Sequence, residues 1–111
     1  MVTRKPSIFI YTHDPDRDFL KEIRAGIEEE GISSDVFERD EDGAADLAHK
    51  AANDSMLGSG IGLSGVNAVL SMRGLKEYRS VEAYHMPTYA EARRLGENSA
   101  RLIKRLGLKE A

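Results

Sequence analysis

The sequence predicts one α/β domain in three layers, α/β/α, around a mixed, mostly parallel sheet of five strands. Short apolar runs rich in β-branched residues alternate with stretches whose apolar residues recur at helical spacing, as in layered α/β proteins. Two of the apolar runs are separated by only two residues, and such a short connection requires an antiparallel pair. The 111 residues suffice for one such domain and are too few for two, so residues 1–111 form a single domain. The expected element order is β-α-β-α-β-β-β-α.

The first strand and the first helix are expected between residues 7 and 31. "SIFIYT" (7–12) consists mainly of β-branched and aromatic residues, which is typical of a buried strand. Asp14 is the expected N-cap of the helix that follows, and Pro15 is its expected first-turn residue. Gly31 is expected to end this helix. The apolar stripe of the helix consists of Phe19, Leu20, Ile23 and Ile27.

The middle of the chain is expected to contribute a weak strand at 33–39, a helix at 42–56, and strands at 60–64, 67–72 and 80–84. The inner face of this helix is made mostly of small side chains, which allow a helix to lie close to a sheet. These inner residues are Ala44, Leu47, Ala48, Ala51 and Ala52.

The last helix is expected over "TYAEARRLGENSARLIKRLG" (88–107). Thr88 and Glu91 have the spacing of a capping box, in which each side chain bonds to the backbone N–H of the other residue. The apolar stripe of this helix consists of Ala92, Leu95, Ser99, Leu102, Ile103 and Leu106.

Composition excludes several classes of function. The net charge of −3, with acidic and basic residues interspersed, provides no basic surface for nucleic acid. The absence of cysteine excludes disulfides, thiolate zinc sites and cysteine nucleophiles. No apolar run resembles a signal peptide or approaches the roughly 20 residues needed to cross a membrane. We expect a soluble, cytoplasmic protein that binds neither nucleic acid nor a membrane.

The glycines of "GIGLSG" (60–65) have the spacing of a dinucleotide-binding turn. Such a turn follows a strand and opens a helix, whose N-terminus faces the pyrophosphate. Here a second strand follows the glycines, so no helix begins at the turn. Glu82 lies about as far along the chain as a ribose-binding acid would, but without the helix this spacing carries no weight. We expect the strand glycines to mark a bulge or the close approach of another backbone.

The three histidines do not have metal-ligand spacing, because His13, His49 and His85 are separated by 36 residues each time. His13 and His85 each follow an expected strand, so both could lie at the carboxyl edge of the sheet. Ligands of α/β proteins usually bind at that edge. A ligand site around these two histidines is therefore one hypothesis, and ordinary structural histidines are the simpler one.

Other polar groups do not have the geometry of known sites. Ser64 and Ser71 lack the strand-to-helix turn of a catalytic nucleophile. The acidic run at 38–46 does not place Asp40, Asp42 and Gly43 as an EF-hand requires. We therefore expect no catalytic residue in this chain.

Three consecutive glutamates, Glu28, Glu29 and Glu30, lie in the last turn of the first expected helix. Each costs from a few tenths to about 1 kcal/mol there, because the helix dipole places negative partial charge at that end. Arg24 has the spacing to pair with Glu28 and offset part of this cost. Either the acidic end is simply solvated, or one carboxylate contacts a cation or a partner protein.

The chain also resembles a known family. "GIEEEGI" (26–32), "GIGLS" (60–64) and "LGENSARLIKRLG" (95–107) occur in the order and spacing found in the small (β) subunit of diol and glycerol dehydratase reactivases. The resemblance extends from about residue 7 to about residue 107, although the segment 73–84 lacks the proline expected before the last strand. The second motif reads Gly-x-Asn-x-Ala-Arg-Leu-x-Lys, with Gly96, Asn98, Ala100, Arg101, Leu102 and Lys104.

The resemblance implies a three-layer α/β/α fold and a chaperone-like function. In that family the large subunit is an actin-like ATPase, and the small subunit resembles the core of the dehydratase medium subunit. The complex displaces that medium subunit by swapping, which releases damaged cobalamin from the coenzyme B12-dependent enzyme. The implied partners are the large reactivase ATPase subunit and the dehydratase subunits.

The resemblance also implies a role for the acidic helix end. In the family, a glutamate of this triplet approaches a magnesium ion that is held mainly by the large subunit. By position this residue is Glu29, and the expected partner-binding residues are Glu28, Glu29 and Glu30. Magnesium and ATP or ADP are expected in the large subunit, with no cofactor bound by this chain alone.

Three alternatives remain open. The chain could be the medium subunit of the dehydratase itself, although that subunit is usually longer, with an N-terminal extension. It could instead be a stand-alone enzyme or ligand-binding α/β domain that uses His13 and His85. It could also be a relative that binds a different large partner. The resemblance implies a heterotetramer of two large and two small subunits and leaves self-association of the free chain open. The choice of diol or glycerol dehydratase as client is also open, as is association with a bacterial microcompartment.

Overall fold

The computed structural model describes residues 5–40, 43–76 and 79–110, with side chains described as far as residue 104. Its elements have the predicted order β-α-β-α-β-β-β-α. The elements are β1 Ser7–His13, α1 Arg17–Glu29, β2 Ser33–Glu38, α2 Ala44–Asp54, β3 Ser59–Ser64, β4 Asn67–Met72, β5 Glu82–His85 and α3 Tyr89–Glu110.

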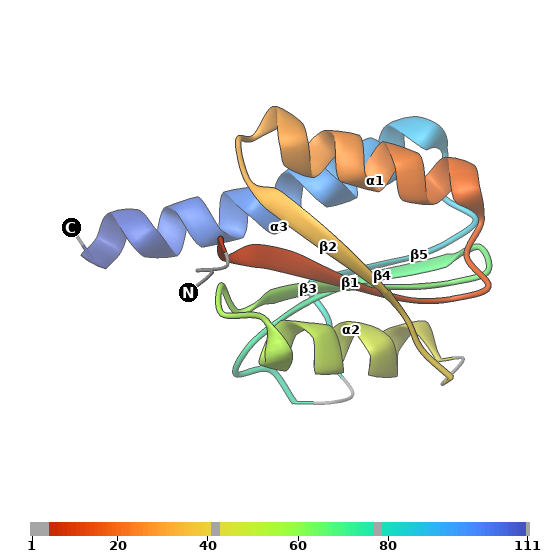
Figure 1. The fold of residues 1–111 in the computed structure, drawn as a ribbon, viewed down its shortest axis with the longest axis horizontal. Helices are drawn as coiled ribbons and strands as arrows, with labels where there is room; N and C mark the ends of the chain where they lie inside the picture. The colour runs from red at the N-terminus through yellow and green to blue at the C-terminus, as the bar shows by residue number, and fades with distance from the viewer. Residues whose placement is uncertain (1–4, 41–42, 77–78, 111) are drawn as a thin grey trace.

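The five strands form one mixed sheet in the order β2-β1-β3-β4-β5. β1 pairs in parallel with β2 and β3, whereas β4 pairs antiparallel with β3 and β5. Four of the five strands therefore run in one direction. Helices α1 and α3 cover one face of the sheet and α2 covers the other (Figure 1). The predicted three-layer architecture is confirmed.

The start of α1 differs from the prediction. Asp16, not Asp14, is the N-cap, and its Oδ1 accepts a 2.9 Å hydrogen bond from the Phe19 N–H. Asp14 has φ of +44°, whereas an N-cap residue is usually extended. Pro15 consequently precedes the helix. At the other end the prediction is confirmed, because Gly31 has φ of +78° and its N–H donates to the Glu28 carbonyl at 2.9 Å.

The last strand is also displaced from its predicted position. The prediction placed it at 80–84, and β5 instead spans Glu82–His85. Pairing with β4 decides the position, because β5 continues until His85 lies opposite Asn67 at the start of β4. The local sequence does not contain this information.

The largest apolar core lies between the sheet and the layer formed by α1 and α3. The inward residues of β1 in this core are Ile8 and Ile10, and both are fully buried. The predicted stripe of α3 is partly confirmed within the described side chains, and Leu106 lies outside them. The buried core residues on this face are Ile8, Ile10, Phe19, Ile23, Ile27, Ile61, Leu63, Ala68, Leu70, Ala92, Leu95 and Ala100.

Helix α2 lies close to the opposite face of the sheet, as its small side chains predict. All five predicted inner residues of this helix are buried. A Cβ at Gly62 would be 2.1 Å from the Ala44 carbonyl oxygen, and one at Gly60 would be 2.1 Å from the Ala52 nitrogen. Glycine is therefore required at both positions because the α2 backbone lies against β3. The prediction of a close backbone approach is confirmed.

Helices α1 and α3 run side by side in the same direction and also touch through glycine (Figure 1). A Cβ at Gly96 would lie 2.0 Å from the Ile23 carbonyl oxygen, and one at Gly26 would lie 2.1 Å from the Arg93 carbonyl oxygen. The predicted capping box at the start of α3 is confirmed, with bonds of 2.8 and 3.0 Å between Thr88 and Glu91. This close packing brings the charged residues of α1 within reach of those of α3.

Candidate functional site

The acidic end of α1 is the candidate site, and α3 supplies the charges that surround it. Glu28 and Glu29 are the last two residues of α1, and Glu30 is the C-cap residue. No basic residue of α1 itself lies in that last turn. The carboxylates therefore depend on other elements for compensation.

Glu29 is held by an arginine of the neighbouring helix. Arg93 of α3 donates from Nη1 to Oε2 of Glu29 at 2.9 Å and from Nη2 to Oε1 of Glu22 at 2.8 Å. The hydrogen bond to Glu22 is the main cause that raises the pKa of Arg93, so this guanidinium stays charged. The Glu29 side chain is 50% exposed, and its other carboxylate oxygen, Oε1, has no protein partner within the described residues.

Glu30 is engaged more completely. Lys104 donates to its Oε1 at 3.0 Å, and Arg101 donates to its Oε2 at 3.2 Å. The Lys104 hydrogen bond is the largest of the effects that lower the pKa of the Glu30 carboxyl from 4.5, and the charges of Lys104 and Arg101 add to it. With 18% of its side chain exposed and both oxygens occupied, Glu30 is a structural contact between the helices.

Glu28 is exposed and has no ion-pair partner in the part of the chain that the structure describes. The predicted pair with Arg24 is wrong, because the Arg24 guanidinium turns to β2 and donates to Oγ and the carbonyl oxygen of Ser34 at 3.2 and 3.3 Å. Compensation for the acidic helix end therefore comes from α3. Ion-pair spacing within one helix therefore gives no sign of this compensation in the sequence.

The site can contribute a ligand to a cation but cannot enclose one. No group of three or more His, Asp or Glu side chains among the described residues is arranged to hold a metal ion. Glu29 offers one half-exposed carboxylate whose second oxygen is held by Arg93. Magnesium takes oxygen ligands and is often bound through one or two carboxylates together with phosphates and water. Glu29 therefore fits the role of a single ligand to an ion held mainly elsewhere.

The two histidines at the carboxyl edge of the sheet are far apart. Ser64 of β3 lies beside His13, and Asn67 of β4 lies beside Ser64. Asn67 in turn lies beside His85 at the end of β5. Three strand spacings correspond to roughly 14 Å, too far for both imidazoles to bind one metal ion. Each histidine contacts its own neighbours, since His13 Nδ1 is 2.9 Å from the Arg39 carbonyl and His85 Nδ1 is 2.6 Å from Asn67.

The turn between β3 and β4 is bonded to the carboxyl end of β1 and to the entrance of α1. Gly65 in that turn has φ of +56°, and its N–H donates to the His13 carbonyl at 3.1 Å. Its carbonyl accepts from the Asp16 N–H at 2.8 Å, at the entrance of α1. The turn therefore bridges β1 and the start of α1 at the point where α/β proteins usually bind ligands.

The remaining sequence candidates have structural surroundings. Ser64 and Ser71 are buried within strands, and neither stands at a strand-to-helix turn. Within the described part of the chain, His49 Nδ1 and Ser71 Oγ are the buried side-chain polar atoms without a hydrogen-bond partner. Glu82 accepts a hydrogen bond from Asn98 at 2.5 Å, so it joins β5 to α3. Asp42 of the acidic run lies outside the described residues.

Comparison with known proteins agrees with this fold. The sequence profile of the family described as dehydratase medium subunit matches residues 5–109. The chain belongs to the dehydratase medium subunit family. A search of curated proteins finds no significant match. None of the helices in the described residues is long and apolar enough to cross a membrane.

Two solved structures that resemble this chain contain reactivating factors. A chain of a glycerol dehydratase reactivase superposes with a TM-score of 0.85 at 28% identity, covering 90% of this chain and 93% of that one. A chain of a diol dehydratase-reactivating factor, whose structure was determined with ADP and Mg²⁺, superposes with a TM-score of 0.83 at 29% identity. This second match covers 91% of this chain and 94% of that one.

Arg93 has no role that the sequence alone indicates. The sequence identifies Arg101 and Lys104 only as parts of a motif, without their contacts to Glu30. One available signal is the spacing of these bases on one side of α3, eight and three residues apart. That spacing becomes informative only when α1 and α3 are known to run side by side in the same direction.

Proposed function

We propose that this chain is the small, non-catalytic subunit of a reactivating factor for a coenzyme B12-dependent diol or glycerol dehydratase. The observation that carries the proposal is the mutual coverage of the two structural matches. Each extends over at least 90% of this chain and 93% of the reactivating-factor chain. In this role the chain binds a large ATPase subunit, in which ATP or ADP and magnesium reside.

Subunit swapping is the proposed mode of action. The family profile is that of a dehydratase medium subunit, and the structural matches are to reactivating factors. A domain that is similar to both is suited to take the place of the medium subunit in the enzyme. Displacement of that subunit would open the enzyme, so that damaged cobalamin leaves and intact coenzyme enters.

Glu29 is the proposed contact to the magnesium ion of the large subunit, with Glu28 and Glu30 beside it at the interface. The ion would neutralise phosphate charge in the nucleotide site of the partner. Within this chain, Arg93 keeps one oxygen of Glu29 occupied, and the Glu29 side chain remains 50% exposed. Glu30 is tied to α3 by Arg101 and Lys104, so it holds the end of α1 in place.

The second candidate is the medium subunit of the dehydratase itself, which the family profile favours. In that role the chain would bind only the other dehydratase subunits and would help to retain cobalamin. A ligand-binding domain centred on His13 and His85 is not supported, because these residues are separated by β3 and β4.

The two candidates are distinguished by co-purification. The tagged chain is mixed with the large reactivase subunit or with the dehydratase subunits, with and without Mg²⁺ and ADP or ATP. We expect a stable complex with the ATPase subunit and nucleotide-dependent transfer onto the dehydratase. Binding to the dehydratase alone, with retained cobalamin, would identify an enzyme subunit and refute the proposal.

The role of Glu29 is tested in the same assay. Glu29→Gln should lower the affinity for the ATPase subunit about tenfold in Mg²⁺ and make the remaining affinity independent of Mg²⁺. The matched control is Asp46→Asn, which removes an exposed carboxylate on α2, on the opposite face of the sheet. Equal affinity of the wild type and Glu29→Gln, with and without Mg²⁺, would exclude the metal contact.

A further inference from the structure

The ion pairs between α1 and α3 form two groups that differ in what they leave free. Glu30 has both carboxylate oxygens occupied, by Lys104 and Arg101, and 18% of its side chain is exposed. Glu29 has one oxygen occupied, by Arg93, and 50% of its side chain is exposed. The first group ties the two helices together. The second group leaves a carboxylate oxygen without a partner among the described residues.

Arg93 is fixed in place from two sides. Its backbone lies directly against α1, because a Cβ at Gly26 would be 2.1 Å from the Arg93 carbonyl oxygen. Its guanidinium is bound by Glu22, whose Oε1 accepts from Nε at 2.9 Å and from Nη2 at 2.8 Å. Glu22 is the less exposed of the two acids, at 25% compared with 50% for Glu29. Arg93 is therefore anchored on Glu22 and reaches Glu29 with its remaining nitrogen, Nη1.

This contact restricts Glu29 to one arrangement. Glu22 and Glu29 are seven residues apart, so they lie two turns apart on one side of α1, and Arg93 spans both. A free glutamate side chain has many rotamers, and fixing it costs conformational entropy when a ligand binds. The Nη1 contact at 2.9 Å holds Oε2 of Glu29 and lowers this cost in advance. Ligation through the other oxygen alone is therefore favoured over chelation through both.

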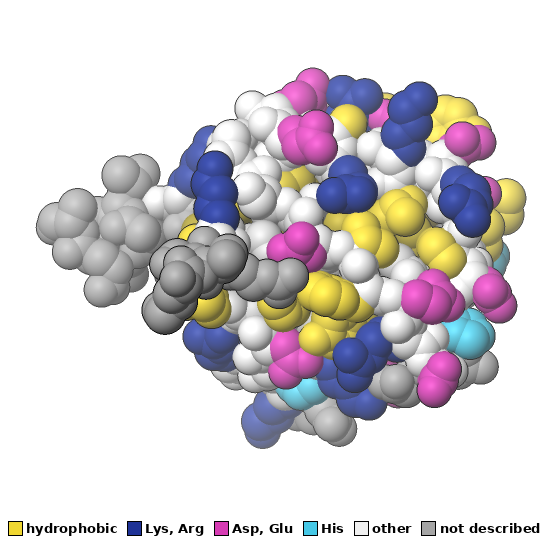
Figure 2. All heavy atoms as spheres, viewed as in Figure 1, with side chains coloured by type: hydrophobic (Ala, Val, Ile, Leu, Met, Phe, Trp, Pro, Cys, Tyr) yellow, Lys and Arg dark blue, Asp and Glu magenta, His cyan; other side chains and the backbone are white. Residues whose placement is uncertain are grey.

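Glu22 also decides the charge around Glu29. Arg93 alone would cancel the charge of Glu29 and would oppose the approach of a cation. Glu22 restores a negative charge, because two carboxylates and one guanidinium add up to a net charge of −1. This local charge matters because the wider surface supplies no field of one sign. Figure 2 shows acidic and basic side chains interspersed along the α1 side of the face drawn.

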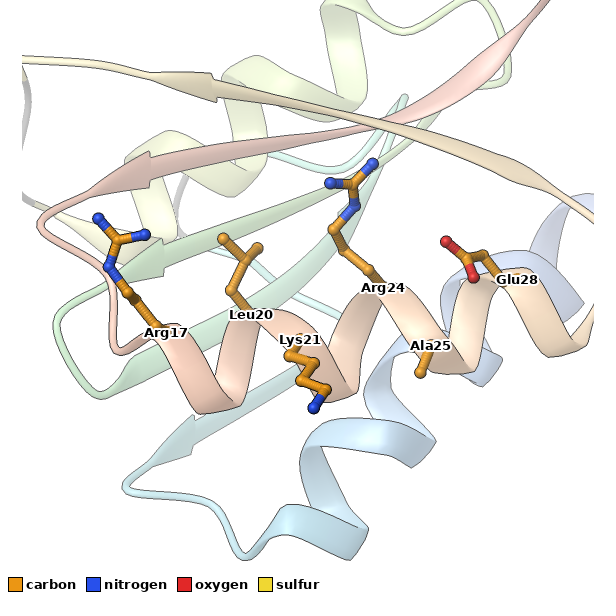
Figure 3. A pocket seen from close by; sticks show the side chains of 6 residues that line it. All are labelled: Arg17, Leu20, Lys21, Arg24, Ala25 and Glu28. Atoms are coloured by element: carbon orange, nitrogen blue, oxygen red, sulfur yellow. The ribbon is translucent and has the colours of Figure 1, made fainter.

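The other charges at the end of α1 do not replace Glu22. Figure 3 shows Glu28 on the same side of α1 as Arg24, whose guanidinium binds β2. Glu30 and its two bases add up to a net charge of +1, since one carboxylate faces two cations. Glu22 is therefore the acid that keeps the surroundings of Glu29 negative while Arg93 holds it.

We propose that Arg93, anchored by Glu22, is a positioning residue that presents Glu29 as a single-oxygen ligand for a divalent cation. This inference rests on the proposed function, in which Glu29 contacts the magnesium ion of the large subunit. Magnesium keeps several waters and is usually bound through one or two carboxylates together with phosphates, so one fixed oxygen suits it. In this arrangement Arg93 and Glu22 do not touch the ion, and both act through Glu29.

The first test uses the full chain without a partner, labelled with ¹⁵N. The Nε–H of Arg93 should give an NMR signal that exchanges slowly with water, because it donates to Glu22. Glu22→Gln should raise this exchange rate about tenfold. Glu29→Gln should change it less than about twofold, because Glu29 binds Nη1 instead. Fast exchange in the wild type, or equal effects of the two variants, would overturn the anchoring of Arg93 on Glu22.

The second test measures the Kd for the large ATPase subunit and ADP in Mg²⁺, and again after a chelator removes the metal. The ratio of the two values should be about tenfold in the wild type. Arg93→Ala and Glu22→Gln should each reduce this ratio to about threefold, chiefly by weakening binding in Mg²⁺. In a Glu29→Gln background neither change should alter the ratio further, because both act through Glu29. The control Arg94→Ala, an exposed base on the same helix, should leave the ratio within about 1.5-fold of the wild type.

The outcomes separate this proposal from the one on which it rests. If Arg93→Ala weakens binding equally with and without Mg²⁺, Arg93 is an ordinary contact and the positioning role is refuted. The same holds if Glu22→Gln keeps the wild-type ratio while Glu29→Gln abolishes it. If Glu29→Gln itself keeps the wild-type ratio, the magnesium contact fails and the positioning role fails with it. Co-purification with the ATPase subunit still decides the subunit role in that case.

Discussion

The two helical layers contact the sheet in different ways. On one face, α2 lies directly on β3, with alanines of the helix against Gly60 and Gly62 of the strand. On the other face, large aliphatic side chains separate α1 and α3 from the sheet. The glycines of that layer, Gly26 and Gly96, lie instead between the two helices. The same residue type thus shortens a helix–sheet distance on one face and a helix–helix distance on the other.

This difference has a consequence for function. A single helix on a sheet buries its inner face and leaves isolated charges outside. Two parallel helices in close contact place the charged residues of both beside each other, as in the pairs of Arg93 with Glu22 and Glu29. The polar network that holds the acidic end of α1 therefore forms in the two-helix layer. The face covered by α2 contributes packing and takes no part in this polar network.

The largest effect is expected from a variant that disrupts the contact between α2 and β3. Gly62→Ala should lower the free energy of unfolding by about 3 kcal/mol, because the new Cβ would lie 2.1 Å from the Ala44 carbonyl oxygen. Urea unfolding followed by circular dichroism measures this loss. The matched control is Gly43→Ala, where the Cβ meets only the movable Asp46 side chain at 3.2 Å. It should cost less than about 1 kcal/mol. Equal losses for the two variants would show that α2 can move away from β3.

A smaller effect is expected at the helix–helix contact. Gly96→Ala places a Cβ 2.0 Å from the Ile23 carbonyl oxygen, but alanine favours the helix by about 1 kcal/mol. The net loss should be about 2 kcal/mol, again by urea unfolding. Arg94→Ala, at an exposed position on the same helix, should stay within about 0.5 kcal/mol of the wild type. A stabilised Gly96→Ala would mean that α1 and α3 are not constrained at this distance.

The smallest expected effect concerns pH and the ion pairs of Glu30. Its pKa in the folded chain is lowered below 4.5, so its pairs with Lys104 and Arg101 stabilise the folded state above that pH. This stabilisation is lost as the pH falls through the folded-state pKa. Wild type should therefore be more stable than Glu30→Gln at pH 7, with a difference that disappears on acidification.

The control for this titration is Glu28→Gln, since Glu28 has no ion-pair partner in the described residues. At pH 7 it should leave the free energy of unfolding unchanged within about 0.5 kcal/mol. Unfolding curves at several pH values provide the comparison. A Glu30→Gln difference that stays constant on acidification would show that the pairs do not contribute.

Much of the fold follows from local sequence patterns. The alanines of α2, the capping box of Thr88 and Glu91, and Gly31 at the end of α1 are recognisable because each depends on neighbours within about one helical turn. The N-cap of α1 could not be placed in the same way. Asp14 and Asp16 both precede a helical stretch, and only the left-handed backbone at Asp14 excludes it.

The candidate site was predicted only in part. The glutamate triplet violates a local rule about helix ends, and that violation is visible in the sequence. Its partners Arg93, Arg101 and Lys104 are more than 60 residues away along the chain, so no local pattern connects them. For the same reason the position of β2 at the edge of the sheet was not predicted, because the order of strands depends on packing of the whole chain.

The sequence by itself determined the element order, the antiparallel turn between β3 and β4, and the close approach of another backbone at the glycines of β3. These features follow from short-range sterics and from the periodic placement of apolar residues. Only the tertiary structure decided which charges meet and which strand is left open. Ion pairs between distant helices and the order of strands in a sheet depend on packing of the whole chain, which no segment encodes alone.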